Sequence, residues 1–228
     1  MKKEHKLTGN QLKIIALIAM TCDHVGKELF PEYNILQIIG RLAFPLFAYM
    51  IAEGCRYTGN RRKHILSIAG LAVLCQVSYW VAEKSLFQCI LVTFTLSICI
   101  IYSVDYANEK KTIFSRLYAV IVCGAVYFIC DLLPIILQDT DFQIDYGIWG
   151  VLLPVGVYFA RNEWKLPVTA AILLPLCLAA GDIQWFSFLA VVLLFFYNGK
   201  RGKARIKNLF FVYYPTHLAV IYLLSLYI

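Results

Sequence analysis

Three ionisable residues interrupt apolar runs near the start of the chain, where a segment that crosses a lipid bilayer would ordinarily carry no charge. Asp23 and His24 lie within LKIIALIAMTCDHVG at 12–26, and Arg41 lies within the next apolar run. An ionised side chain in hydrocarbon costs roughly 2.5 to 3.5 kcal/mol on insertion scales, so such residues usually face the interior of a helix bundle and serve a function there. These three residues are therefore our candidates for a site of chemistry.

Each of the three has a chemical and a structural interpretation. The imidazole of His24 titrates near neutral pH and suits a general base. The cation of Arg41 could stabilise an oxyanion or bind a phosphate, and Asp23 could stabilise a protonated ring or hold an ammonium group. Alternatively, Asp23 forms an ordinary ion pair with Lys27 or with Arg41, and His24 only packs between helices.

The elements that must position these residues are two helices joined by a short turn. Counted from that turn, His24 and Arg41 each lie about six residues into the membrane, which is roughly 10 Å at about 1.5 Å per residue. A polar group at one depth is therefore possible. Neighbouring residues of a helix point about 100° apart, so Asp23 is not expected to orient the ring of His24. Either Glu28 or a group on another helix would do so.

Composition places these helices in a membrane protein. The chain has 228 residues, of which 61% are hydrophobic and 15% charged, with a mean hydropathy of +0.69. Soluble domains are roughly 45 to 50% apolar. We predict an all-α integral membrane protein, one domain over 1–228, built as a single bundle of about nine transmembrane helices. The predicted segments are 11–30, 35–55, 64–82, 86–106, 114–137, 145–160, 165–181, 182–198 and 207–228.

The distribution of basic residues predicts how the helices are oriented. With a cytoplasmic N-terminus, 18 of the 21 Lys and Arg residues fall in the cytoplasmic loops or at their helix ends. This bias predicts a multi-pass protein of the cell's inner membrane whose C-terminus lies outside. The same bias explains the net charge of +7 without a nucleic-acid partner. The first apolar run shows no cleavage site of a signal peptide. The eight Cys residues show no metal-binding spacing, and we expect them to be packing residues.

The sequence resembles the TraX family of membrane acetyltransferases, named for the conjugation protein that acetylates the amino terminus of F-type pilin. The resemblance covers the chain from end to end, in blocks that occur in family order. The blocks are LKIIALIAMTCDHVG (12–26), IGRLAFPLFAYMIAEGCRYTGN (39–60), CQVSYW (75–80), DYGIWGVLLP (145–154), YNGKRG (197–202) and FFVYYPTHL (210–218). The family is similar to a wider group of transmembrane acyltransferases in which an intramembrane histidine works with acetyl-CoA from the cytoplasm. By that likeness His24 is the candidate catalytic histidine.

The resemblance also implies where acetyl-CoA binds. Basic side chains in two cytoplasmic loops could contact its phosphates, although retention of those loops inside the cell explains the same charges. The glycines of the second loop would let its backbone approach a phosphate closely. His217, beside the kinking Pro215, could take part or could bond a backbone carbonyl. The candidate cofactor-binding residues are Arg61, Arg62, Lys63, Asn198, Lys200, Arg201, Tyr214 and His217, and no metal is expected.

The expected function is transfer of an acetyl group from cytoplasmic acetyl-CoA to an amine or hydroxyl on the outer side, such as a pilin N-terminus or an amino sugar of the envelope. His24 would act either as a general base or as a nucleophile that becomes acetylated. One alternative is a proton-coupled transporter or lipid-binding protein, in which the buried ionisable residues relay protons. Another is a purely structural partner of an envelope complex.

Overall fold

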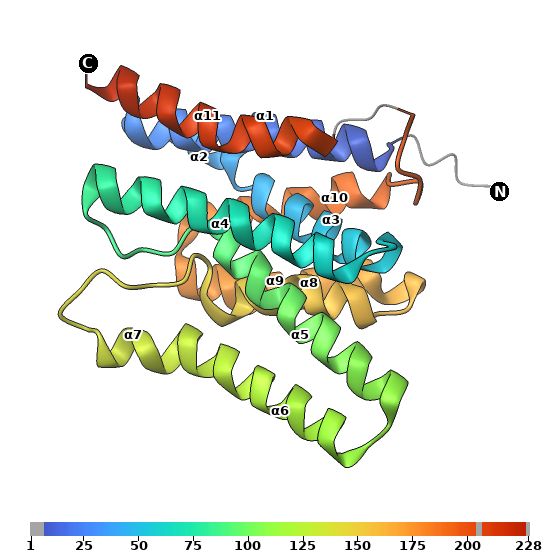
Figure 1. Cartoon of the computed structure of the whole chain (residues 1–228). Helices are drawn as coiled ribbons and strands as arrows, with labels where there is room; N and C mark the ends of the chain where they lie inside the picture. The colour runs from blue at the N-terminus through green and yellow to red at the C-terminus, as the bar shows by residue number, and fades with distance from the viewer. Residues whose placement is uncertain (1–6, 204–206, 227–228) are drawn as a thin grey trace. The chain divides into compact units, whose positions relative to one another are not determined.

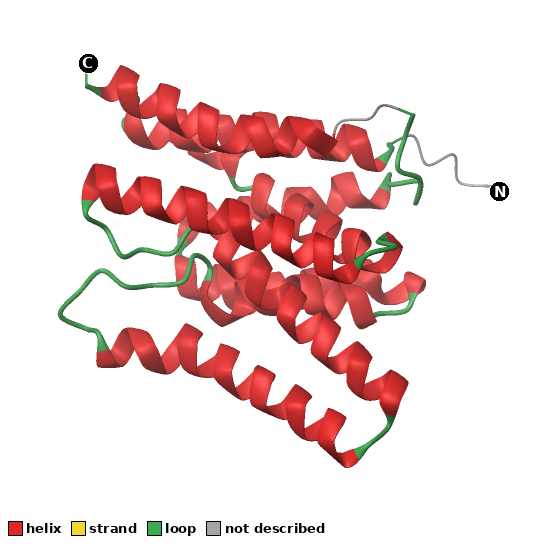
Figure 2. Ribbon diagram, in the orientation of Figure 1, coloured by secondary structure: helices red, strands yellow, loops and turns green. Residues whose placement is uncertain are grey.

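The computed structural model describes residues 7–203 and 207–226, with the side chains of 207–211 excepted. Helices make up most of this described part, and β-pairing within it is confined to two isolated bridges, Leu7 with Tyr197 and Gln88 with Ile144. Figure 2 shows the helices joined by loops. The predicted all-α membrane fold is confirmed.

Each predicted segment coincides with one described helix or with a short series of them (Figure 1). The α-helices are α1 (Gly9–Glu28), α2 (Asn34–Gly40), α3 (Ala43–Tyr57), α4 (Arg61–Glu83), α5 (Ile90–Lys110), α6 (Ile113–Tyr127), α7 (Leu133–Ile136), α8 (Gly147–Phe159), α9 (Lys165–Ala180), α10 (Leu189–Phe195) and α11 (Lys207–Ser225). Shorter stretches are the π-helical η1 (Phe128–Leu132) and the 3₁₀-helical η2 (Asn162–Trp164) and η3 (Asp182–Phe188).

Prolines explain two interruptions that the prediction missed. The segment 35–55 is broken between α2 and α3 at Arg41, four residues before Pro45. A proline has no N–H to bond the carbonyl four residues back, and its ring clashes with that carbonyl. In the same way, Pro134 follows the π-helical turn η1, four residues after Cys130. The first break places Arg41 where one helix ends and the next begins.

Within the described residues, five helical stretches are long and apolar enough to cross a membrane by length and composition: Asn34–Tyr57, Arg61–Glu83, Ile90–Lys110, Ile113–Ile136 and Asn162–Ala180. Two other apolar helices in the described part, Gly147–Phe159 and Asp182–Phe195, are shorter. At about 1.5 Å per residue, the 13 residues of α8 extend roughly 20 Å, less than the roughly 30 Å of a hydrocarbon core. We predicted about nine segments of spanning length, and these two helices are shorter than that length.

The chain divides into two compact units. The terminal unit comprises residues 1–50 and 162–228, and the central unit comprises residues 51–161. In the terminal unit, α1 packs against α2 and α11, α2 packs against η3, and α9 packs against α10. Figure 1 shows α11 lying alongside α1, so the first and last helices of the chain pack together.

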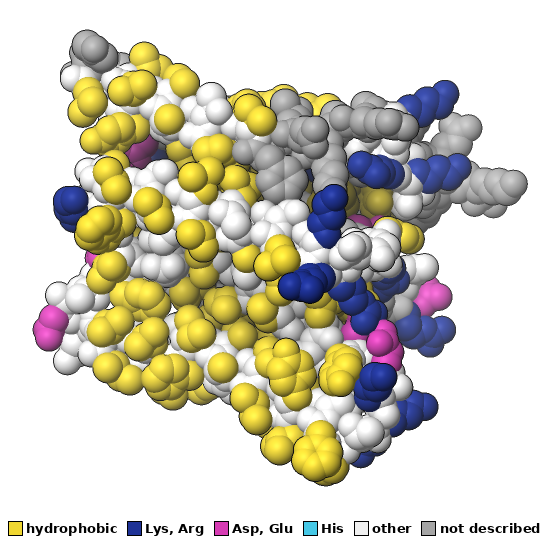
Figure 3. Space-filling model, viewed as in Figure 1, with side chains coloured by type: hydrophobic (Ala, Val, Ile, Leu, Met, Phe, Trp, Pro, Cys, Tyr) yellow, Lys and Arg dark blue, Asp and Glu magenta, His cyan; other side chains and the backbone are white. Residues whose placement is uncertain are grey.

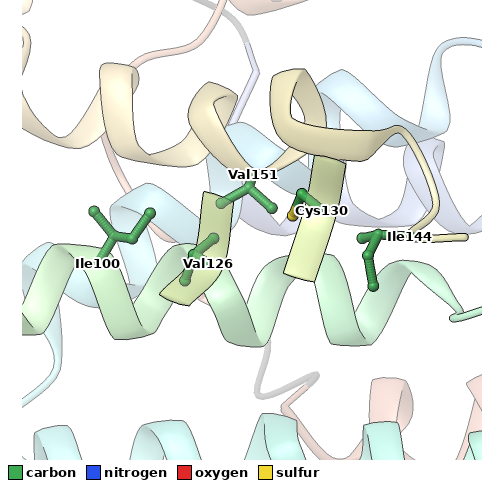
Figure 4. Packing of buried hydrophobic residues seen from close by; sticks show 5 residues of the cluster. All are labelled: Ile100, Val126, Cys130, Ile144 and Val151. Carbon is green, nitrogen blue, oxygen red and sulfur yellow. The ribbon is translucent and has the colours of Figure 1, made fainter. Parts of the chain in front are cut away.

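The central unit is built around α5, which packs against α4, α6 and α8. One of its apolar clusters combines Ile100 of α5, Val126 and Cys130 of the α6–η1 stretch, Ile144 of the segment before α8, and Val151 of α8 (Figure 4). Among the described residues all eight cysteines are free thiols, five of them buried. Cys130 is thus a packing residue of this cluster, as the sequence predicts for the cysteines.

Polar contacts hold the loops of the central unit at two ends of its helices. At one end, Arg61 pairs with Asp105 at 3.1 Å and with Glu109 at 2.8 Å. At the other end, the hydroxyl of Ser85 donates to the carboxylate of Asp141 at 2.6 Å. The basic residues that begin α4 and those that join α5 to α6 thus share one end, as the bias of positive charge predicts. Figure 3 shows Lys and Arg side chains gathered where α5 meets α6, with hydrophobic side chains along α6.

The Asp141 contact predicts a loss of stability in acid. Hydrogen bonds from the Ser85 hydroxyl and the Leu86 N–H lower the pKa of Asp141 below its usual 3.8. A carboxyl whose folded-state pKa is lowered stabilises the fold above the unfolded-state pKa, and this contribution is lost as the pH falls through the folded-state value. The melting temperature of the wild type should therefore exceed that of Asp141→Asn at about pH 6, and the gap should narrow towards about pH 3. Asp139→Asn, in the same loop, is the control. A gap that stays constant with pH would contradict the prediction.

Candidate functional site

Two glycines let α1 and α2 approach closely enough to form the site. The helix α1 starts at a capping box, in which the Thr8 side chain accepts a hydrogen bond from the Gln11 N–H. Towards its other end, a Cβ added to Gly26 would lie 2.8 Å from the Cβ of Leu36 in α2. A Cβ added to Gly40 would lie 2.8 Å from the Cα of Asp23. Small residues allow such close contact of helices in a membrane.

This packing predicts opposite effects of one substitution at two glycines. Gly40→Ala should destabilise the protein by roughly 1 to 3 kcal/mol, because the added methyl overpacks the contact with Asp23. Gly70→Ala in α4 should be neutral or stabilising by up to about 1 kcal/mol, because a Cβ there meets nothing within 4 Å and alanine favours the helix. Thermal unfolding in detergent measures both. Equal melting temperatures for the two variants would show that the Gly40 contact carries no constraint.

Asp23 is held by two cations. Its Oδ1 lies 2.6 Å from Nη2 of Arg41 on the neighbouring helix, and its Oδ2 lies 2.6 Å from Nζ of Lys27, one turn further along α1. Both structural interpretations of Asp23 from the sequence are therefore realised together. The residue is buried, so the ion pair with Arg41 fixes the break between α2 and α3 against α1.

Arg41 brings a third element to the site. Besides Asp23, its Nη1 donates to Oε1 of Gln184 in η3 at 3.2 Å, and its Nε donates to the backbone carbonyl of Gln37 at 3.4 Å. A guanidinium has five N–H donors, so two remain beyond these three bonds. Because arginine only donates, the carbonyl end of the Gln184 amide must face it.

The amide nitrogen of Gln184 is a buried donor whose partner is missing within the described part of the chain. The side chain is 3% exposed, and Nε2 has no hydrogen-bond acceptor there. Leaving a buried polar group unpaired costs roughly 1 to 3 kcal/mol, so such groups in folded proteins need an explanation. An acceptor supplied by a substrate or by a water molecule would satisfy it.

His24 is oriented by His217 of α11. The Nδ1 of His24 lies 2.9 Å from Nε2 of His217, and the two rings stack with centroids 5.1 Å apart. The Nδ1 of His217 in turn lies 2.9 Å from the backbone carbonyl oxygen of Tyr213. Of the two orienting partners that the sequence left open, a group on another helix is the one observed, and Glu28 is not.

These contacts fix the positions of the protons when both rings are neutral. A carbonyl oxygen only accepts, so Nδ1 of His217 carries a proton and donates it to Tyr213. The Nε2 of neutral His217 is then an acceptor, and Nδ1 of His24 must donate to it. The remaining nitrogen of His24, Nε2, therefore keeps its lone pair. Neighbouring contacts support this alignment, since Tyr213 stacks on His217 and its hydroxyl lies 2.6 Å from Oγ1 of Thr21.

The residues predicted to bind acetyl-CoA fall into separate groups. In the central unit, Arg61 is engaged by Asp105 and Glu109, whereas the exposed Arg62 and Lys63 line a shallow pocket of about 350 Å³. In the terminal unit, His217 and the buried Tyr214 pack together at the histidine pair, with ring centroids 5.4 Å apart, rather than among the basic loops.

The loop of Asn198, Lys200 and Arg201 has a structural role of its own. The backbone carbonyls of Lys200 and Arg201 accept hydrogen bonds from the first N–H groups of α1, at 2.8 and 2.9 Å, and the Asn198 side chain accepts from the Lys200 N–H. Gly202 has a φ of +92°, and a Cβ there would lie 3.0 Å from Oγ1 of Thr8. The glycine thus serves the approach of the loop to α1. The side chains of Lys200 and Arg201 remain exposed.

Comparison with known proteins gives the family. The TraX protein family model matches residues 8–225, nearly the whole chain. The chain belongs to the TraX family. A relative from Dichelobacter nodosus is named probable fimbrial assembly protein FimC, serogroup H1. It is 24% identical over an alignment of 258 positions, which covers 97% of each chain. An uncharacterised protein of Rickettsia prowazekii (strain Madrid E) is 37% identical over 154 residues, 67% of this chain and 55% of that relative. No solved structure matches.

Sequence reasoning missed two features of this TraX chain. Gln184 is a lone amide at the start of an apolar segment, and that polar interruption is the signal that could have singled it out. The second feature is a polar cluster in the central unit, where Nδ1 of His64 lies 2.7 Å from the Tyr102 hydroxyl and the Tyr158 hydroxyl donates to Asp105 at 2.5 Å. These residues come from three helices, so no local spacing points to them.

Proposed function

We propose that this TraX-family protein transfers an acetyl group from cytoplasmic acetyl-CoA to an amine or hydroxyl on the outer side of a bacterial inner membrane. The observation that carries the proposal is the histidine pair, in which His217 leaves a lone pair on Nε2 of His24. A pilin N-terminus is the acceptor that the name of the Dichelobacter nodosus relative favours. An amino sugar of the envelope would meet the same chemistry.

In the proposed reaction, Nε2 of His24 accepts a proton from the attacking neutral amine or hydroxyl. The bond from that nitrogen or oxygen to the thioester carbonyl carbon forms, the carbon–sulfur bond breaks, and the departing thiolate of CoA takes up the proton. The protonated ring of His24 donates through Nδ1 to His217, which keeps it aligned during the transfer. His217 is thus a positioning residue in this proposal.

The thioester oxygen gains negative charge as the bond forms, and it needs hydrogen-bond donors. The unpaired Nε2 of Gln184 and the two unused N–H groups of Arg41 are the donors that we assign to it. Asp23 has the role of holding Arg41 in place. Removing one donor to an oxyanion typically lowers kcat by roughly a hundredfold to a thousandfold.

The negatively charged part of acetyl-CoA requires cations at the cytoplasmic ends of the helices. Exposed Arg62 and Lys63 in the first turn of α4, and exposed Lys200 and Arg201 in the loop before α11, have the charge and accessibility for this contact. Arg61 is less suited, because two carboxylates already neutralise it. Each pair belongs to a different unit, and each is a separate candidate for the contact with phosphates.

The test uses the full-length protein purified in detergent or in lipid nanodiscs. Acetyl-CoA labelled in the acetyl group is mixed with the protein and with candidate acceptors, first a pilin N-terminal peptide and then glucosamine. The expected result is a gain of one acetyl group on an acceptor and a rise in the protein's melting temperature with CoA. Label that remains on the protein when acceptor is omitted would favour an acetyl-histidine intermediate. Absence of both CoA binding and transfer, together with pH-driven flux in vesicles, would favour a transporter.

A further inference from the structure

A large apolar groove lies between α5 and α6 in the central unit. It has a volume of about 810 Å³, and Ile65 at the start of α4 also lines it. The lining residues farthest along the helices from the turn between α5 and α6 are aliphatic side chains and a cysteine: Leu96, Cys99, Val122, Ala125, Val126 and Ile129. Both α5 and α6 belong to stretches long and apolar enough to cross a membrane. In a bilayer, such a groove is filled by hydrocarbon.

The groove changes character towards the turn that joins α5 to α6. Its lining there contains hydroxyl groups, those of Tyr106, Thr112, Ser115 and Tyr118. The rings of Tyr106 and Tyr118 meet edge to face, with centroids 6.2 Å apart. Side chains with an apolar body and a polar tip are typical of the level where acyl chains give way to lipid head groups.

The same turn carries concentrated positive charge. Lys110 and Lys111 immediately precede Thr112, and Arg116 is bonded through its backbone N–H to the Thr112 carbonyl at 3.2 Å. All three side chains are exposed, and Figure 3 shows the positive charge at this end beside the hydrophobic surface of α6. Basic groups at the mouth of a pocket between transmembrane helices favour anionic lipid head groups.

We infer that this groove binds one acyl chain of an anionic glycerophospholipid, whose phosphate head group is held by Lys110, Lys111 and Arg116. The apolar groove accommodates the acyl chain, and the hydroxyl groups lie at the level of the ester groups. The basic side chains of the turn complement the negative charge of the phosphate. The lipid binds to the central unit and takes no part in the proposed acetyl transfer, so the inference stands whether or not that transfer occurs.

Native mass spectrometry of the full-length protein tests the inference. The protein is released from mixed micelles that contain equal amounts of phosphatidylglycerol and phosphatidylcholine with identical acyl chains. The wild type should retain phosphatidylglycerol about tenfold more than phosphatidylcholine, since each basic residue near the surface contributes about 1 kcal/mol towards an anionic lipid before screening. Equal retention of the two lipids would overturn the inference, as would a second copy of the protein in place of lipid.

Two variants separate the head group from the acyl chain. The triple substitution Lys110→Gln, Lys111→Gln, Arg116→Gln should abolish the preference for phosphatidylglycerol, whereas Arg62→Gln with Lys63→Gln at the α4 turn should preserve it. Ala125→Phe should reduce retention of both lipids several-fold by filling the groove. The charge variants alter exposed side chains only, so they decide the question even if Ala125→Phe fails to fold. A triple variant that keeps the preference, or a folded Ala125→Phe with unchanged retention, would contradict the inference.

Discussion

Replacing His24 by Gln is expected to lower the rate of acetyl transfer by at least about a hundredfold, the lower end of what general-base catalysis contributes. The reason is the loss of the Nε2 lone pair, which the contact with His217 leaves available in the wild type. The measurement is transfer of labelled acetyl from acetyl-CoA to the acceptor under single-turnover conditions. CoA should still raise the melting temperature of the variant, because no part of the proposed CoA contact is altered.

The matched control is His64→Gln, which replaces a second half-buried histidine that bonds Tyr102 in the central unit. This variant should retain transfer within a few-fold of the wild type. Full activity of His24→Gln would remove His24 from the mechanism. Equal losses in both variants would indicate that the effect comes from the fold rather than from the site.

The role of His217 is separated from that of His24 by comparing two substitutions at position 217. His217→Gln keeps a carbonyl oxygen that can accept the His24 Nδ1 proton, whereas His217→Leu removes the acceptor. The Leu variant should therefore show the lower kcat and an altered pH profile, and the Gln variant should recover part of the activity. Identical profiles for the two variants would indicate a packing role alone.

Arg41→Met is expected to destabilise the protein by roughly 3 to 5 kcal/mol, because it removes one partner of a buried ion pair. The same variant releases the carbonyl oxygen of Gln184, so it disturbs both neighbours of the guanidinium. Lys27→Met provides an unusually close control, since Lys27 contacts the other oxygen of the same carboxylate at the same 2.6 Å distance. The Lys27 side chain is 45% exposed against 15% for Arg41, and a pair with an exposed cation contributes at most about 1 kcal/mol.

Chemical denaturation in detergent measures this pair of variants, and Asp23→Asn with Arg41→Met completes a double-mutant cycle. The coupling energy between Asp23 and Arg41 should exceed that between Asp23 and Lys27. Similar losses of stability in Arg41→Met and Lys27→Met would show that burial does not distinguish the two pairs. Arg41→Lys should restore part of the stability and less of the activity, because lysine keeps the charge but lacks the planar set of donors.

Sequence alone determined the membrane class, the helical segments and the residues on which the proposed chemistry depends. Apolar runs of spanning length can only be helices, because every backbone polar group in hydrocarbon must be bonded within its own segment. Charge in such runs is costly, so Asp23, His24 and Arg41 stood out without any knowledge of the fold. The asymmetry of basic residues gave an orientation that remains a prediction.

Only the tertiary structure decided which partner each of these residues takes. His217 lies 193 positions from His24, and Gln184 lies 143 positions from Arg41, so no helical periodicity could join them. The pairs exist because α11 and η3 pack on α1 and α2, and because Gly26 and Gly40 leave no side chain between the two N-terminal helices. The spacing of residues along a helix determines which side chains share one face, whereas tertiary packing determines which faces meet. The free lone pair on Nε2 of His24 depends on that packing, because it requires the contact with His217.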